Sequence, residues 1–107
     1  MTVQTATKTL QRLERFYNAG FRTPLVDHAL HKVLTRQIAR DEADLVQVEA
    51  RLDEFEDRYA MDSATFWEKY QAGQLSDDAD YVEWNAFCKM RQRLRQRLTI
   101  LRGEDSL

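Results

Sequence analysis

Apolar residues recur at alternating steps of three and four along the middle of the chain, from residue 34 to residue 59. They are Leu34, Ile38, Leu45, Val48, Leu52, Phe55 and Tyr59. This heptad seam is the pattern that a helix uses to pack along another helix. Thr23 and Pro24 form a typical helix start, and no glycine or further proline follows before residue 59. The pattern predicts one long helix over 24–59, with the polar Asp41 marking a change of packing partner.

Three shorter amphipathic segments flank or follow this long helix. Residues 3–19 place Leu10, Leu13 and Phe16 on one face and end before Gly20. Residues 63–72 carry three aromatic side chains, and Gly73 closes that segment. Residues 77–102 open with acidic side chains, which favour the positive end of a helix dipole, and stop before Gly103. Each segment is therefore expected to be a helix.

These elements predict an all-α fold in which residues 1–107 form a single helical domain. The helix over 24–59 should pack antiparallel on the helix over 77–102, as a long coiled-coil-like hairpin with the aromatic helix at its corner. The N-terminal helix should pack on the open end or extend from it. Charge supports this direction of packing, because residues 41–84 carry fourteen acidic and three basic side chains, whereas residues 85–107 carry six basic and two acidic ones.

Composition limits the cellular compartments and the kinds of chemistry to be expected of this protein. Cys88 is the single cysteine, so no disulfide forms within the chain. No secretory signal and no long apolar span is visible, and we expect a cytoplasmic protein that does not enter a membrane. His28 and His31 share a helical face, but no second ligand pair completes a metal site. No nucleophile stands at motif spacing from a base. We therefore expect no enzyme activity, no metal and no cofactor.

Two surface features remain as candidate binding sites. The first is an apolar stripe near the start of the long helix, for which the shorter last helix leaves no partner; it comprises Val26, Leu30, Val33 and Leu34, followed by Arg36. The second is a basic row on the last helix, expected to face away from the seam: Lys89, Arg93 and Arg97. This row lacks aromatic residues between its cations, so it favours solvent or an acidic partner over nucleic acid.

From Tyr59 onward the chain resembles a group of small bacterial helical proteins that are antitoxin components of toxin–antitoxin pairs. The matching residues are Tyr59, Met61, Ser63, Phe66, Gly73, Leu75, Asp77, Asp78, Asp80, Glu83, Trp84 and Ala86. The resemblance implies a non-enzymatic protein that binds and neutralises a cognate toxin. Two alternatives stay open beside it. One is a homodimeric coiled-coil scaffold or adaptor, and the other is a basic-helix RNA or DNA binder.

Overall fold

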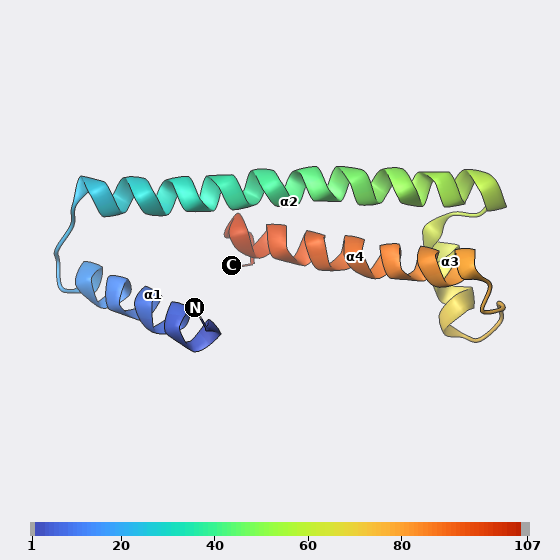
Figure 1. Ribbon diagram of the computed structural model, residues 1–107, viewed down its shortest axis with the longest axis horizontal. Coiled ribbons are helices and arrows are strands. Elements are labelled where there is room, and N and C mark those ends of the chain that lie inside the picture. Colours follow the sequence, from blue (N-terminus) through green and yellow to red (C-terminus); the bar gives the residue numbers. More distant parts are fainter. Residues whose placement is uncertain (1, 106–107) are drawn as a thin grey trace. The chain divides into compact units, whose positions relative to one another are not determined.

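A computed structural model describes residues 2–105, and this part of the chain contains four helices and no strand. Along the chain they are α1 (Val3–Asn18), α2 (Pro24–Tyr59), α3 (Ser63–Gln71) and α4 (Ala79–Leu101) (Figure 1). The all-α prediction is confirmed, and the predicted bounds of α2 match. The predicted range of α4 was too long at both ends, because Asp77 and Asp78 precede its first turn and Arg102 is its C-cap.

Local capping explains where α2 and α3 begin. The Thr23 hydroxyl accepts a hydrogen bond from the backbone N–H of Val26 at 3.1 Å. Asp62 accepts one from the backbone N–H of Thr65 at 2.7 Å, and this bond lowers the pKa of its carboxyl. Each bond satisfies an N–H that has no partner within the helix. Gly73, with φ of 73°, adopts the left-handed backbone that ends α3 at little steric cost.

The chain divides into two compact units, and the division falls within α2. The N-terminal unit is Met1–Leu34, described from Thr2, and contains α1 with the first turns of α2. The hairpin unit is Thr35–Leu107, described to Asp105, and contains the rest of α2 with α3 and α4. The division comes after Leu34, whereas the sequence placed the change of packing partner at Asp41.

In the hairpin unit, α2 and α4 run side by side in opposite directions, with α3 at the closed end (Figure 1). Ion pairs between α2 and α4 with its C-cap follow this direction, because residues 41–49 pair with the C-terminal end of α4 and residues 51–58 pair with its N-terminal end. The pairs are Asp41–Arg97, Glu42–Arg102, Glu49–Arg95, Arg51–Glu83 and Arg58–Asp80. The antiparallel hairpin is thus confirmed.

An aromatic stack forms the core at the closed end of the hairpin. Trp84 of α4 is fully buried between Phe66 of α3, at a ring distance of 3.9 Å, and Phe55 of α2, at 5.6 Å. The indole N–H of Trp84 donates to the Ser63 hydroxyl at 3.0 Å, so the buried polar atoms are paired. Leu52 joins this cluster with 1% of its surface exposed. The short α3 is therefore held by its aromatic side chains, as the sequence predicted.

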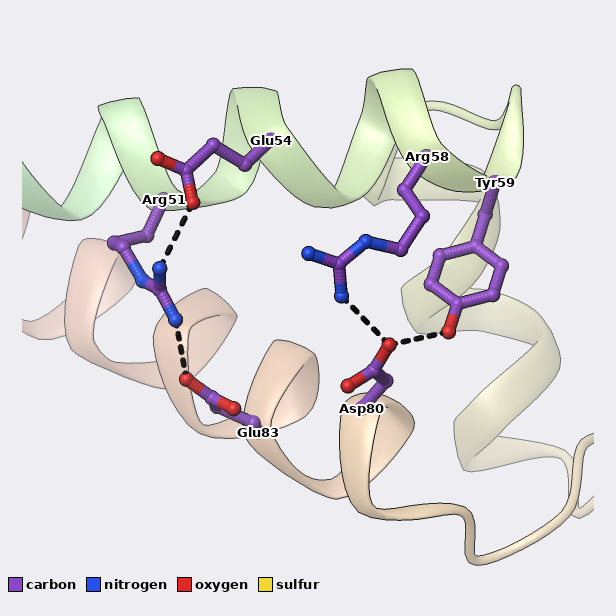
Figure 2. Close-up of polar contacts among 6 residues, drawn as sticks. All are labelled: Arg51, Glu54, Arg58, Tyr59, Asp80 and Glu83. Carbon is purple, nitrogen blue, oxygen red and sulfur yellow. Dashed lines mark hydrogen bonds and ion pairs between the residues drawn. The ribbon is translucent and has the colours of Figure 1, made fainter.

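A polar network spans the same end on the surface (Figure 2). Asp80, in the first turn of α4, accepts hydrogen bonds from the Tyr59 hydroxyl and from Arg58. These bonds lower the pKa of the Asp80 carboxyl, and the bond from Tyr59 contributes most. Glu83 pairs with Arg51 at 2.6 Å. The carboxylates of Asp80 and Glu83 thus both bind side chains of α2.

Candidate protein-binding surface

The N-terminal unit consists of two amphipathic helical segments without a closed core. None of its described residues, 2–34, is buried. Large apolar side chains are exposed throughout this unit: Val3, Leu10, Phe16, Phe21, Leu25, Leu30, Val33 and Leu34. The hairpin unit is about twice as long and exposes only Val46, Val82, Met90 and Ile100 among its described large apolar side chains. Exposed apolar surface is thus concentrated at the N-terminus, where it marks a candidate interaction surface.

A groove between α1 and the start of α2 gathers much of this surface. Its volume is about 550 Å³. We call it the apolar groove, and its lining is Ala6, Thr9, Leu10, Leu13, Leu25, Val26, Ala29, Leu30 and Val33. Leu10 is 61% exposed and Val33 is 68% exposed, so the side chains on both walls are open to solvent. The two helices therefore present a concave apolar surface within one unit.

The predicted partner-binding residues are distributed unevenly over this surface. Val26, Leu30 and Val33 line the apolar groove, and Val26 is half-buried. Leu34 is exposed in the same unit but is not part of the lining. Arg36 is exposed on α2 in the hairpin unit. The structure thus brings together three of the five predicted residues.

The opposite wall of the groove was not predicted from the sequence. Leu10 and Leu13 were recognised as one face of the N-terminal helix, but they were not assigned to the candidate site. Their pairing with Val26 and Leu30 requires α1 to fold back on the start of α2, which heptad spacing alone does not specify. The available signal was the amphipathic pattern of residues 3–19 beside a second apolar stripe a few residues past Gly20.

A polar cluster fixes the turn between α1 and α2. Asp27 accepts hydrogen bonds from the Tyr17 hydroxyl and from Arg22, the latter at 3.1 Å. The bond from Tyr17 lowers the pKa of the Asp27 carboxyl, and the same bond raises the pKa of the phenol. Phe16 and Phe21 stack across the turn at a ring distance of 5.5 Å. These contacts position the two walls of the groove.

One basic side chain, Arg12, borders the apolar surface of this unit. Arg12 borders a second hollow with Thr9, Leu13, Phe16 and Val26, which shares three lining residues with the apolar groove. Lys8 and Arg15 line a further hollow with Arg12 and Glu14, and this hollow shares no lining residue with the apolar groove. Asp27 is bound by Tyr17 and Arg22, as described above, and Glu14 is the other acidic residue of this unit. The N-terminal unit as a whole therefore carries an excess of basic side chains, and Arg12 places one of them at the edge of the groove.

The basic row on α4 differs from its prediction at one position. Lys89 and Arg93 are exposed. Arg97, by contrast, turns toward α2 and donates two hydrogen bonds to the buried Asp41 carboxylate, at 2.8 and 3.1 Å. The prediction that Arg97 faces away from the seam is wrong, because Asp41 occupies a seam position and its buried carboxylate binds the Arg97 guanidinium. A three-residue cationic row is thus reduced to Lys89 and Arg93.

The side chains with potential for chemistry occupy structural positions. Burial raises the pKa of the Cys88 thiol, which holds it in its unreactive protonated form. The Ser63 hydroxyl accepts a hydrogen bond from the indole N–H of the buried Trp84. Within residues 2–105, no group of three or more His, Cys, Asp or Glu side chains is arranged to hold a metal ion. The apolar groove is thus the strongest candidate site in the described chain.

Comparison of the chain with protein-family models, with curated proteins and with solved structures gives no match. Among the described helices, none combines the length and the apolar content that crossing a membrane requires. The residues of this chain and their arrangement are therefore the basis on which a function can be proposed.

Proposed function

We propose that this protein is a non-enzymatic binding protein that neutralises a cognate toxin by holding it on the apolar groove. The observation that carries the proposal is the contrast between the two units. The hairpin unit buries a complete aromatic core, whereas the described part of the N-terminal unit buries no residue and exposes most of its apolar side chains. The α1 helix and the first turns of α2 gain little burial from each other, so a bound partner would stabilise this unit.

The resemblance to antitoxin components supplies the identity of the partner class. It is carried by residues of the hairpin unit, such as Trp84 and Asp80, which have structural roles there. We propose that the hairpin unit is the stable scaffold and that the N-terminal unit contacts the toxin. Such a protein needs no catalytic group, because occupying a surface of the toxin is enough to block it.

The alternative of a homodimeric coiled-coil scaffold has weaker support. Its main motivation was the heptad seam, but Val48, Leu52 and Phe55 are buried against α3 and α4 of the same chain. The apolar groove is then the surface with which a second copy would associate. The alternative of a basic-helix nucleic-acid binder also has less support, because Arg97 of the basic row forms an ion pair with Asp41.

The test of the proposal is co-expression with the product of an adjacent gene. We expect the wild-type chain to rescue growth from that product and to co-elute with it. The variant Val33→Asn should lose both effects. The matched control is Val46→Asn, because Val46 lies on the same helix and is 68% exposed, as Val33 is, yet does not line the apolar groove. Absence of both complex and rescue with the wild-type chain would refute the proposal.

A further inference from the structure

We propose that the apolar groove accepts an amphipathic helix whose apolar stripe is flanked by acidic side chains. This inference rests on the proposed function and specifies the chemistry of the partner. The groove has the form that this mode of recognition requires, since two helices wall a concave apolar surface that a third helix can fill. Its walls run over Ala6–Leu13 on α1 and Leu25–Val33 on α2. Each wall is about two helical turns long, enough for three anchors at helical spacing.

Charge decides between the classes of helix that would fit. The N-terminal unit has five basic side chains, and Arg12 borders the apolar surface directly. Of its two acidic side chains, Asp27 is bound by Tyr17 and Arg22. Glu14 alone is left to offset the remaining cations. A partner with acidic flanks is complementary to this surface, whereas like charges placed against it repel.

The same charge pattern argues against a second copy of this unit as the occupant. Two copies packed groove to groove would place the Arg12 side chains of both N-terminal units at the edge of one shared apolar core. An anionic membrane surface would satisfy the charge, but a bilayer engages the outward apolar face of a helix. Here Leu13 and Val26 line a hollow between two helices instead. A separate acidic helix is therefore the occupant that fits both shape and charge.

The experiment uses the full chain and two labelled synthetic peptides. Both peptides carry the same leucine heptads over about three turns, flanked in one by Glu and in the other by Lys. Binding is measured by fluorescence anisotropy at low and high salt. We expect the Glu-flanked peptide to bind about tenfold more tightly than the Lys-flanked one, and the difference to shrink as salt rises.

Two pairs of variants separate the apolar contribution from the charge contribution. Val33→Asn should weaken the Glu-flanked peptide about tenfold, because an apolar contact is replaced by an amide that must be desolvated. Val46→Asn should leave its affinity unchanged. Arg12→Glu should reduce the preference for the Glu-flanked peptide, whereas Arg93→Glu, at an exposed site of the hairpin unit, should not.

Three results would overturn the inference. One is equal binding of both peptides, or tighter binding of the Lys-flanked peptide. Another is binding of neither peptide together with co-sedimentation on anionic vesicles that Val33→Asn abolishes, which would assign the groove to a membrane surface. The third is a concentration-dependent dimer that Val33→Asn disrupts and the Glu-flanked peptide does not compete with. None of these readouts involves the toxin, so they can fail while growth rescue succeeds, and the reverse.

Discussion

The buried carboxylate of Asp41 depends on Arg97, and removing the guanidinium should destabilise the hairpin unit. The Asp41 side chain is 2% exposed, and it accepts two hydrogen bonds from Arg97 and one from Gln37 at 2.8 Å. The bonds from Arg97 hold the pKa of Asp41 below its usual value against the opposing effect of burial. In Arg97→Leu the carboxylate would stay buried with Gln37 as its one remaining partner.

The magnitude follows from what the carboxylate loses. Breaking a buried ion pair by removing one partner costs about 3–5 kcal/mol. Arg97 itself is 51% exposed, so the pair is buried on one side only and water can approach from the other. We therefore expect a loss of about 2–3 kcal/mol in the free energy of unfolding, between the values for exposed and for buried pairs. For a unit of this size, that corresponds to a fall in Tm of about 10–20 °C.

Urea denaturation followed by far-UV circular dichroism measures this loss. The matched control is Arg95→Leu, because the Arg95–Glu49 pair is exposed on both sides and longer, at 3.4 Å. The control should change stability by less than about 0.5 kcal/mol. The double variant Asp41→Leu/Arg97→Leu should recover most of the loss, since no charge then stays buried. A cost for Arg97→Leu equal to that of Arg95→Leu would refute the reasoning.

Three further predictions concern the hairpin unit. Trp84→Ala should cost about 3–5 kcal/mol by urea denaturation, because it empties the aromatic stack, whereas Trp67→Ala at a half-buried site should cost less than half as much. Stability should be constant between about pH 5 and pH 9 and fall as pH drops through the ordinary carboxyl range and below, since the pKa values of Asp41 and Asp80 are lowered by folding; an unchanged urea midpoint at pH 3 would contradict this. Cys88 should react with a thiol reagent at least about tenfold more slowly in the native protein than in urea, measured by absorbance of the released product.

Periodicity was sufficient to predict the hairpin because its apolar positions are regular. The spacing from Leu45 to Tyr59 specifies one helical face, and the short connection through the aromatic helix requires antiparallel packing. Such packing brings Trp84 beside Phe55 and Tyr59, at ring distances of 5.6 and 5.8 Å. Turn chemistry at Thr23, Pro24 and Gly73 then limited the helix ends to within a few residues.

Individual ion pairs were harder to predict because they depend on side-chain reach rather than on spacing. Arg97 was assigned to the outer face of α4 by its position in an i, i+4 row. The long, flexible arginine side chain can nevertheless reach the seam. That conformation is favourable because it pairs the guanidinium with the Asp41 carboxylate, which is buried there. For a related reason, only one of the two walls of the apolar groove was predicted. The α2 wall was visible as a stripe in one helix, whereas the α1 wall depends on how two helices meet.

Hydrogen exchange of the full chain, with and without the product of the adjacent gene, tests the central claim most directly. The claim is that a partner binds the apolar groove of the N-terminal unit. It predicts that partner binding slows exchange throughout Val3–Asn18 and over the start of α2, from about Leu25 to Leu34, while Phe55 and Trp84 in the hairpin core change little. Protection confined to α4, or complex formation without protection of α1, would contradict the claim.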